Sequence, residues 1–497
     1  MSKIAVIGAG FSGLSAAAYL SVEGHDVHVF EKNATAGGRA RQLKTKEGYV
    51  FDMGPSWYWM PDVFERFFKD FGYSVADGYE LKLLDPSFDI VFKGEKISIP
   101  SDYTELKRLF ETIEKGSSEK LDQFMKEAQH KYKAGMENLV YMPGLSVREF
   151  VDPKIVKEAF GLQIFSSFSK HVRKYFSNHR FILLMEFPVL FLGAMPQETP
   201  ALYSLMNYAG LKLGTWYPLG GFGKIIDFIQ LICEKQGSVF HFDSPVEKIN
   251  VEENLVQDII VNGTKVTFDA VVASADYHHV ENDLLAEADR NYGEKYWKKK
   301  TFAPSCLIYY LGVTKKINTL QHHTLFFDED LFQHSVEIYK SPEWPSRPLF
   351  YACCPSKTDD TVAPNGHENL FLLMPIAPGL EDNEIIREKY FKMMMTRLEK
   401  HAGEKIEGYI DYKKSYCIND FITDYNAYKG NAYGLANTLM QTAFLKPKIR
   451  NKKIANLFYA GQLTGPGPGV PPSLISGNIA ANQLLKYLKK RKHEIPV

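Results

Sequence analysis

Three glycines near the amino terminus, Gly8, Gly10 and Gly13, have the spacing of a loop that binds a pyrophosphate. An apolar run comes before them, an alanine-rich helical pattern follows, and a second apolar run ends at Glu31. In this arrangement the first glycine allows a tight turn, the second lets the backbone approach the pyrophosphate, and the third lets the helix pack closely on the strand. Glu31 stands where a carboxylate can accept hydrogen bonds from an adenosine ribose. We therefore expect this stretch to bind a dinucleotide, and a structural turn is the alternative.

A second glycine pair, Gly37 and Gly38, follows shortly after Glu31. The pair leaves room for another close backbone approach, and Arg39 can meet a phosphate or the edge of a flavin ring. A turn with a solvated arginine is the alternative, and the short distance from Glu31 along the chain favours binding. The aromatic residues 57–59 could either form a wall of the site or belong to the core.

The segment 456–477, NLFYAGQLTGPGPGVPPSLISG, repeats the physical character of the opening loop. An apolar strand pattern ends at Gly461, a Gly/Pro loop follows, and Ser473 is placed to cap a helix whose N-terminal amides point outward. A Gly/Pro-rich linker is the alternative, but a linker is seldom followed at once by a long Ala/Leu-rich helix. We therefore expect a second ligand contact here.

Length and composition exclude several classes of protein. The 497 residues exceed the ~250 to 300 that one core usually serves, so two or more domains are expected. Lys plus Arg and Asp plus Glu each number 59, which gives no reason to expect a nucleic-acid partner. The five cysteines match neither a disulfide framework nor a metal-ligand spacing. The adjacent His278 and His279 do not offer ligands on one face, so we expect no metal site.

Apolar spacing and turn residues predict the main elements. Helices are expected at 61–71, 224–235 and 382–401, and Asn262-Gly263 is expected to be the turn of a β-hairpin. Residues 104–142 are charged and helix-prone, whereas 301–445 alternate apolar strands with helix.

The apolar run 181–195 raises the possibility of a membrane contact. Glu186 and Pro188 interrupt it, so it is too broken to span a bilayer but apolar enough to lie against one. Basic residues that could meet anionic head groups lie nearby, namely Lys170, His171, Arg173, Lys174 and Arg180. A buried helix pair is the alternative. The uncharged run 4–22 is already explained by the glycine loop, so we expect no transmembrane segment.

Taken together, these motifs resemble those of the carotenoid desaturases, of the bacterial phytoene desaturase type. The resemblance covers essentially the whole chain and is carried by the Gly8, Gly10 and Gly13 loop, Glu31, Gly37-Gly38-Arg39, FDMGPS at 51–56 and the closing motif at 458–477. This family belongs to a larger flavoprotein group that also holds amine oxidases and protoporphyrinogen oxidases. Its members bind FAD across a discontinuous nucleotide domain.

By position, the resemblance implies a set of cofactor-binding residues. They are Gly8, Gly10, Gly13, Glu31, Gly38, Arg39, Pro55, Ser56, Val246, Gly461, Gln462, Gly469 and Val470. The three glycines of the first loop would cradle the pyrophosphate, and Glu31 would hold the adenosine ribose. Gln462 stands where many relatives have an acid, so its hydrogen bonds must be those of a neutral amide. The resemblance names no catalytic residue, and the proton acceptor stays unknown.

The implied fold is α/β, with a Rossmann-like FAD-binding domain assembled from discontinuous segments. We expect that domain to comprise 1–85, 217–280 and 446–497, and a mixed-sheet substrate domain to comprise 86–103 and 281–445. Residues 104–216 would form a helical, apolar lid or membrane-contact region.

Family members remove hydrogen from long polyenes. We expect stepwise dehydrogenation of phytoene toward lycopene by hydride transfer to the flavin N5, in a cytoplasmic protein bound peripherally to the inner face of the cytoplasmic membrane. Alternatives within this chemistry are a desaturase of a hydroxylated carotenoid (1-hydroxycarotenoid 3,4-desaturase type), a squalene-type desaturase and a carotene isomerase.

Two other classes are disfavoured by particular residues. Some amine oxidases attach flavin through a cysteine near the carboxy terminus, and here no cysteine follows Cys417. A non-enzymatic lipid or prenyl escort protein of the same fold has no flavin chemistry, and the intact glycine motifs count against it.

Overall fold

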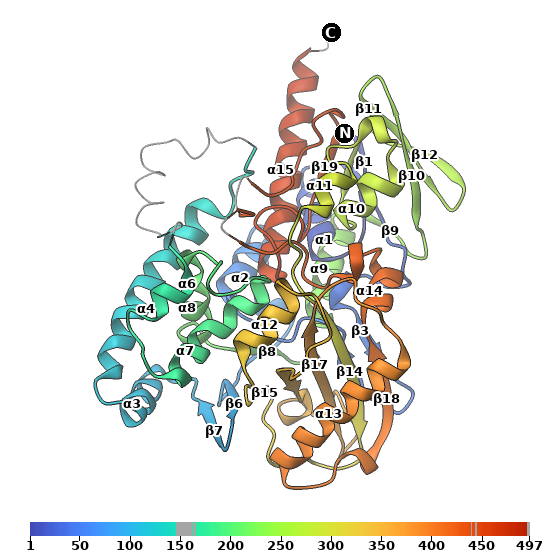
Figure 1. Ribbon diagram of the computed structural model, residues 1–497. Helices are drawn as coiled ribbons and strands as arrows, with labels where there is room; N and C mark the ends of the chain where they lie inside the picture. The colour runs from blue at the N-terminus through green and yellow to red at the C-terminus, as the bar shows by residue number, and fades with distance from the viewer. Residues whose placement is uncertain (146–162, 164–165, 439, 443–444, 495–497) are drawn as a thin grey trace.

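The computed structural model describes residues 1–145, 163, 166–438, 440–442 and 445–494. Part of the region expected to be a lid, residues 146–162 and 164–165, therefore lies outside the described residues. Figure 1 shows a parallel sheet with its helices in the upper half, a mixed sheet below it, and a group of helices to one side. The expected α/β fold is confirmed.

Strands from distant parts of the chain form the parallel sheet. Their order is β19 (Leu457–Tyr459), β13 (Ala270–Ala273), β1 (Lys3–Ile7), β2 (Asp26–Phe30) and β9 (Val239–His241). Every neighbouring pair is parallel. The central strands are continuous apolar runs because both faces of the sheet are covered, one by helices and the other by a three-stranded antiparallel sheet of residues 246–267. The carboxyl ends of β1, β2, β13 and β19 therefore meet along one edge.

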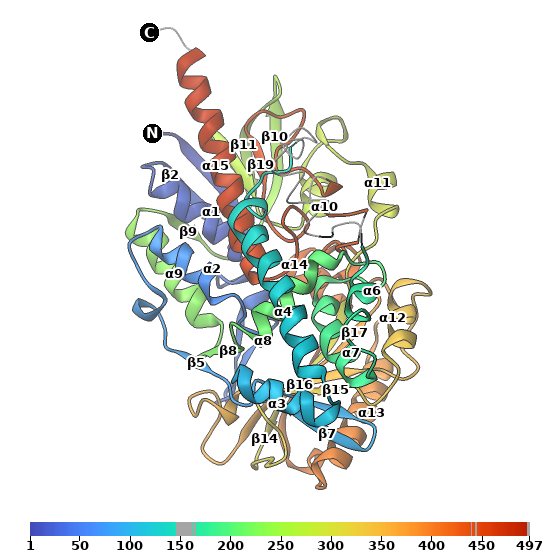
Figure 2. The same ribbon diagram turned by 90° about the vertical axis from the view of Figure 1, so that its left-hand side faces the viewer.

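Three helices pack together beside this sheet, and small residues set their spacing. They are α1 (Phe11–Ser21), α9 (Gly223–Lys235) and α15 (Val470–Glu494), with α1 lying against both others. A Cβ atom on Gly477 of α15 would stand 2.3 Å from the carbonyl oxygen of Ser12. The Ser15 hydroxyl donates to the Leu474 carbonyl at 2.7 Å. In Figure 2 the long α15 runs beside α1.

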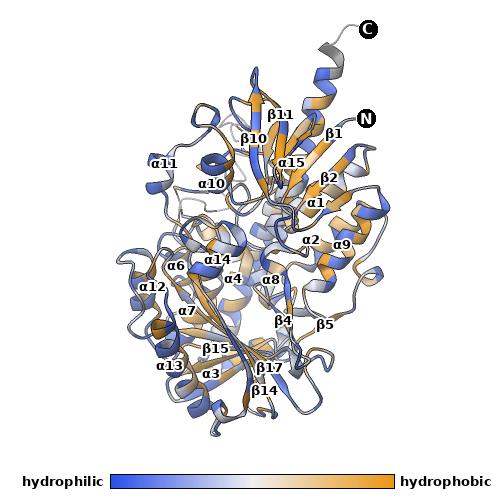
Figure 3. Ribbon diagram, turned by 90° about the vertical axis from the view of Figure 1, so that its right-hand side faces the viewer, coloured by the Kyte–Doolittle hydropathy of each residue, from blue (hydrophilic) through white to orange (hydrophobic). Residues whose placement is uncertain are grey.

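The second large sheet of the protein is mixed, with both parallel and antiparallel strand pairs. Its order is β18 (Ile410–Tyr416), β14 (Ser305–Val313), β17 (Glu368–Ile376), β16 (Phe350–Cys353), β15 (His323–Phe326), β6 (Phe88–Phe92) and β7 (Glu95–Ile99). The helix α13 (Glu384–Ala402) packs on one face, where Met394 meets Tyr309 and Cys354 in one core. Cys353 belongs to the core on the other face, so the adjacent cysteines point to opposite faces of the sheet. Figure 3 shows the hydrophobic strands of this sheet and the hydrophilic residues on α13.

A group of helices covers the second face of the mixed sheet near β6 and β7. It contains α3 (Tyr103–Ile113), α4 (Ser117–Ala134), α6 (Phe168–Val172), α7 (His179–Glu186), the 3-10 helix η5 (Phe187–Leu192) and α8 (Leu205–Leu211). Phe181, Met185 and Val189 are at most 2% exposed, so these apolar side chains of the run 181–195 face the core. Arg173 and Arg180 pair with Glu186 and Glu95. The alternative of buried helices is therefore correct for the described part of this run, because its apolar face meets other helices.

The remaining elements are short. They are β3 (Gln42–Lys44), β4 (Val50–Asp52), α2 (Pro61–Lys69), β5 (Leu81–Leu83), β8 (Trp216–Pro218), β10 (Val246–Glu252), β11 (Leu255–Val261), β12 (Thr264–Thr267), α10 (Tyr277–His279), α11 (Glu294–Lys298), α12 (Leu331–Tyr339) and α14 (Ile418–Tyr425). The predicted helices at 61–71, 224–235 and 382–401 are confirmed as α2, α9 and α13. Asn262 and Gly263 have φ angles of 48° and 73° between β11 and β12, which confirms the predicted hairpin turn.

One predicted helix boundary is wrong. The helix α15 begins at Val470, so Ser473 lies inside its first turn and its hydroxyl donates to the Gly469 carbonyl at 2.8 Å. Pro471 and Pro472 occupy the positions where a missing N–H costs nothing, and they let the helix begin before the serine.

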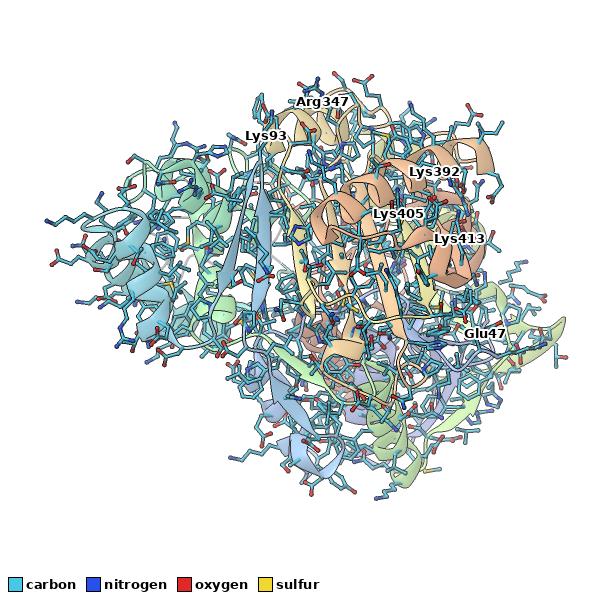
Figure 4. The ribbon with its side chains drawn as sticks, turned by 90° about the horizontal axis from the view of Figure 1, so that it is seen from below. Glu47, Lys93, Arg347, Lys392, Lys405 and Lys413 are labelled. Carbon is cyan, nitrogen blue, oxygen red and sulfur yellow. The ribbon has the colours of Figure 1, made fainter. Side chains whose placement is uncertain are left out.

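No helix within the described ranges is long and apolar enough to cross a membrane. The outer surface near α13 is charged, and Figure 4 labels several of its lysines. Lys392, Lys405 and Lys413 pair with Glu407, Glu399 and Glu388. These cations are therefore largely neutralised by neighbouring carboxylates.

Candidate functional site

A cavity of about 420 Å³ opens at the carboxyl edge of the parallel sheet. Most of the residues expected to bind a cofactor line it: Gly8, Gly10, Glu31, Gly38, Arg39, Pro55, Val246, Gly461, Gln462, Gly469 and Val470. Ligands of parallel α/β sheets bind at such an edge. The structure thus brings together segments from 8–55, 246 and 461–470. We call this the cofactor cavity.

Two of the expected residues do not line this cavity. Gly13 lies in α1, where an added Cβ would stand only 1.9 Å from the carbonyl oxygen of Gly8. Its role here is to let α1 approach the loop, which matches the packing role of the third glycine. The hydroxyl of Ser56 lies 3.1 Å from the hydroxyl of Tyr351. Ser56 therefore faces the mixed sheet.

The first loop offers backbone to a ligand rather than side chains. Gly8 has φ of +99°, and its N–H donates to the Phe30 carbonyl at 2.7 Å. A Cβ on Gly38 would stand 3.2 Å from the Cα of Gly10, so these two backbones approach closely. The helix α1 begins at Phe11 without a side-chain cap. Its first N–H groups are therefore available to an anion, which the helix dipole also attracts.

Glu31 is fixed before any ligand binds. It is 5% exposed, and one carboxylate oxygen accepts the N–H of Ala9 at 2.8 Å. The other oxygen accepts the backbone and side-chain N–H groups of Asn33 at 2.9 and 2.7 Å. The oxygen that accepts from Ala9 makes one hydrogen bond and keeps further acceptor capacity, as a ribose hydroxyl requires.

Arg39 is half-buried, and residues from the carboxy-terminal part of the chain hold its guanidinium. Its Nη2 donates to the Asn431 carbonyl at 3.2 Å, and its guanidinium carbon lies 5.0 Å from the ring centroid of Tyr425. The Gln462 amide, oriented to satisfy its neighbours, accepts from Arg39 Nη2 at 3.1 Å and donates to the Ala432 carbonyl at 3.2 Å. Gln462 therefore holds Arg39 with a neutral amide, as the sequence implies.

The closing loop brings a second helix N-terminus to the same cavity. Gly461 and Gly469 have φ of +116° and +111°, which favour glycine over residues with a side chain. The Gly461 N–H donates to the Ser476 hydroxyl at 2.9 Å. Gly469 and Val470, where α15 begins, line the cavity. Two helix N-termini thus face one space.

Sequence analysis did not assign Asp276 to this site. Asp276 follows β13 and lines the cofactor cavity; one carboxylate oxygen accepts the His278 N–H at 3.0 Å. Its other oxygen has no hydrogen-bond partner among the described residues. Burial raises its pKa, and the nearby Arg39 opposes that rise. Its place at the carboxyl end of a parallel strand was the available signal.

Tyr425 and Asn33 were also not assigned to the site. Tyr425 belongs to α14 and lies near Arg39. The mixed sheet determines the position of α14, so no local motif in the sequence indicates this contact. Asn33 lines the cavity and fixes Glu31.

The donors and acceptors around the cavity match an adenine dinucleotide. The glycine backbones and two helix N-termini suit a pyrophosphate, and Glu31 suits a ribose. The Nε of Arg39 and one oxygen of Asp276 are buried without a partner within the described chain. Such groups need a ligand or water to satisfy them.

A second, apolar cavity of about 60 Å³ lies between the mixed sheet, α12 and η5. Its lining includes Phe187, Leu325, Ile338 and Tyr351. Leu373 and Tyr433 line both this cavity and the cofactor cavity, so the two are neighbours. We call the second space the inner cavity.

One group of potential metal ligands occurs among the described residues, although sequence analysis predicts none. His322, His323 and Cys353 place one ligand atom each within 4.8 Å of one another, and all are buried. The two histidines considered from the sequence, His278 and His279, pair instead with Glu294 and Asp283.

Comparison with known proteins agrees with this geometry. The model of the flavin containing amine oxidoreductase family matches residues 11–485, and the chain belongs to this family. It is 41% identical to the carotenoid 3,4-desaturase of Haloarcula japonica, covering 97% of this chain and 98% of that protein. It is 28% identical to the zeta-carotene-forming phytoene desaturase of Myxococcus xanthus, covering 98% and 94%.

The fold is also that of a solved oxidoreductase from Methanosarcina mazei. The TM-score is 0.59 at 18% identity, over 96% of this chain and 99% of the other. The protein is a flavin-dependent oxidoreductase, and its cofactor is FAD.

Proposed function

We propose that this protein is an FAD-dependent carotenoid desaturase that dehydrogenates phytoene stepwise toward lycopene. The observation that carries the proposal is the shared wall of the two cavities. Leu373 and Tyr433 separate the cofactor cavity from an apolar space that has no charged lining residue within the described chain. A long polyene offers no polar handle, so an apolar channel leading to the flavin is the site it needs.

FAD, when bound, supplies a hydride acceptor at N5 of its ring. The residues of this chain bind it, orient the polyene and keep water out. We propose that the loop at Gly8 and Gly10 and the N-terminus of α15 hold the pyrophosphate and that Glu31 holds the ribose. Pro55, Val246 and the other assigned residues complete the site, with Gly13 acting through helix packing.

The inner cavity positions the polyene and excludes water from it. Its walls from β15, β16, β17 and α12 are apolar and aromatic, so a polyene carbon can be held without competing water. The delocalised polyene itself spreads the positive charge that hydride loss creates. The site therefore needs no oxyanion hole or metal for this step.

The test uses purified protein with bound FAD and phytoene in liposomes. Lengthening conjugation moves the carotenoid absorption to longer wavelength, and chromatography identifies the intermediates. An unchanged phytoene spectrum, with flavin demonstrably bound, would reject phytoene as the substrate.

A second candidate is 3,4-desaturation of a hydroxylated carotenoid. It is favoured by the 41% identity to a carotenoid 3,4-desaturase, against 28% to the phytoene desaturase of Myxococcus xanthus. Parallel incubations with phytoene and with a 1-hydroxycarotenoid separate the two candidates by which substrate gains a double bond.

We also propose peripheral association with the inner face of the cytoplasmic membrane, because the substrate dissolves in the bilayer. The contact is assigned to exposed apolar side chains, Phe332 on α12 beside the inner cavity and Met440, which are 56% and 75% exposed. Flotation with liposomes should retain the wild type and lose Phe332→Ser/Met440→Ser. Equal flotation of both proteins would exclude these side chains as the contact.

The domain boundaries stated from the sequence remain a proposal. The parallel sheet draws its strands from 3–30, 239–273 and 457–459, and the mixed sheet draws its strands from 88–99 and 305–416. Both observations support two discontinuous units.

A further inference from the structure

A buried tyrosine and histidine stand together at the wall of the inner cavity. Tyr351 lines the cavity, and its hydroxyl lies 2.6 Å from Nδ1 of His323. The two residues lie on the antiparallel strands β16 and β15, and are 5% and 0% exposed. The hydroxyl also lies 3.1 Å from that of Ser56, the neighbour of Pro55 in the cofactor cavity. The tyrosine hydroxyl is therefore placed near both cavities.

Two aromatic contacts and one hydrogen bond continue from this pair. The Trp57 ring stacks on His323 with centroids 4.1 Å apart and planes inclined by 10°. The rings of His323 and His322 meet edge to face at 4.5 Å. Nδ1 of His322 lies 2.8 Å from the hydroxyl of Thr358, which is half-buried. A series of polar groups thus leads from the inner cavity to the half-buried Thr358.

Neither histidine has its hydrogen-bonding capacity filled. Nε2 of His322 and Nε2 of His323 have no partner among the described residues, although both rings are buried. Buried polar atoms without a partner are uncommon and call for an explanation. A purely structural histidine pair would be expected to satisfy both nitrogens.

We infer that Tyr351 is the catalytic residue that takes the proton in the desaturation, and that His323 receives the proton that Tyr351 gives up. This inference rests on the proposed function. One carbon of the polyene loses a hydride to the oxidised flavin. The neighbouring carbon loses a proton to the Tyr351 oxygen while the Tyr351 proton moves to Nδ1 of His323. The electron pair of that broken C–H bond forms the new double bond.

The chemistry of the pair agrees with these roles. Burial raises the pKa of Tyr351 well above 10, so the phenol is neutral before the step. Burial, and then the neighbouring His322, lower the pKa of His323 well below 6.5, so the imidazole is neutral and can accept. A proton beside a carbocation is far more acidic than an imidazolium, so a weak base suffices. The face of Trp57, which stacks on His323, stabilises the imidazolium that forms when His323 accepts the proton.

The same histidines could instead hold a metal ion with Cys353. Nδ1 of His323 already lies 2.6 Å from the hydroxyl of Tyr351, and this contact occupies that nitrogen. We therefore favour proton transfer. The finding of one tightly bound transition-metal ion per chain, lost in Cys353→Ala, would overturn this choice.

The experiment compares the wild type with Tyr351→Phe and His323→Gln, all loaded with FAD, under anaerobic conditions with phytoene in liposomes. Glutamine can accept a hydrogen bond from Tyr351 but cannot hold a proton, so it separates positioning from proton transfer. The matched control is Tyr309→Phe, a buried tyrosine on the opposite face of the same sheet whose hydroxyl donates to the Arg387 carbonyl. Flavin bleaching reports hydride loss, and chromatography reports the new double bond.

Tyr351→Phe is expected to lower the rate of flavin bleaching by roughly 100-fold or more, within the range for general acid–base residues. His323→Gln is expected to lose about 10-fold or more and to lose the slowing that the wild type shows in D₂O. Flavin content and unfolding temperature should stay at wild-type values in both, and Tyr309→Phe should keep the wild-type rate.

Wild-type bleaching with undiminished rates in Tyr351→Phe and His323→Gln would refute the inference and leave the proposed function intact. No bleaching of the wild type by phytoene or by a hydroxylated carotenoid would refute both. A loss in Tyr351→Phe accompanied by loss of flavin or by a lower unfolding temperature would assign the tyrosine a structural role and refute its catalytic one.

Discussion

The cofactor cavity and the inner cavity lie side by side but are built in different ways. The cofactor cavity is made largely of backbone from glycine-rich turns and of two helix N-termini, with few side chains such as Glu31 and Arg39. The inner cavity is made of side chains that the mixed sheet and α12 bring together. The difference teaches that binding a shared cofactor needs local motifs, whereas binding a particular polyene depends on the register of distant strands.

If this comparison holds, the largest effect should come from a change in backbone spacing at the cofactor cavity. Gly13→Ala places a Cβ 1.9 Å from the Gly8 carbonyl oxygen, so α1 must move. We expect a loss of about 3 kcal/mol in the free energy of unfolding and loss of bound flavin. Chemical denaturation and flavin absorbance measure both. Gly293→Ala, where an added Cβ meets nothing within 4 Å, is the control. Normal flavin content in Gly13→Ala would show that this close contact is dispensable.

A change at the ribose position should affect the cofactor without unfolding the sheet. Glu31→Arg replaces the carboxylate that accepts from Ala9 and Asn33 with a cation, and removes the acceptor for the ribose. We expect the purified variant to retain less than about a tenth of the wild-type FAD, because charged hydrogen bonds contribute about 1.5–3 kcal/mol each. Glu253→Arg, at an exposed position, is the control. Full flavin occupancy in Glu31→Arg would reject the assignment.

Filling the inner cavity should stop carotenoid turnover without affecting the cofactor cavity. Ile338→Trp adds volume to a space of about 60 Å³, and therefore should abolish carotenoid turnover while FAD stays bound. Gln333→Trp lies on the same helix at an exposed position and should keep activity. The measurement is product chromatography beside flavin absorbance. Turnover at the wild-type rate in Ile338→Trp would remove the inner cavity from the substrate path.

The smallest effect is expected at Asp52, which neighbours Met53 in the wall of the cofactor cavity. Burial raises the pKa of this carboxyl from 3.8 to about 6. Because the folded state binds this proton more tightly than the unfolded state, the contribution of Asp52 to stability falls as the pH rises from about 4 to 6. Asp52→Asn should flatten that part of the pH dependence, by roughly 2–3 kcal/mol at most. Denaturation midpoints at several pH values test this; a slope equal to that of the wild type would contradict it.

The same contrast explains what the sequence could and could not predict. Gly8, Gly10 and Glu31 act through local spacing, and the structure places all three at one cavity. The family and the flavin cofactor follow from these motifs and were predicted correctly. Tyr351 and His323 are 28 residues apart and meet only through strand register, which no local motif encodes.

Two features of the chain were not determined by local composition, because composition does not specify what a segment packs against. The apolar run 181–195 could be covered by lipid or by protein, and the structure covers its described side chains with helices. Ser473 is a good capping residue, but prolines that tolerate the first turn let α15 begin three residues earlier. In both cases the local pattern is compatible with two structures, and the neighbouring residues determine which one forms.

The packing of α15 on α1 has a consequence for synthesis of the chain on the ribosome. The strand β19 supplies one edge of the sheet. The helix α15 supplies one of the two helix N-termini at the cofactor cavity, and its Leu474 carbonyl accepts a hydrogen bond from the Ser15 hydroxyl. A nascent chain that has emerged only as far as residue 450 has its first glycine loop but lacks the groove into which the flavin closes. Cofactor loading must therefore wait until residues 457–470 have left the ribosome and joined the sheet.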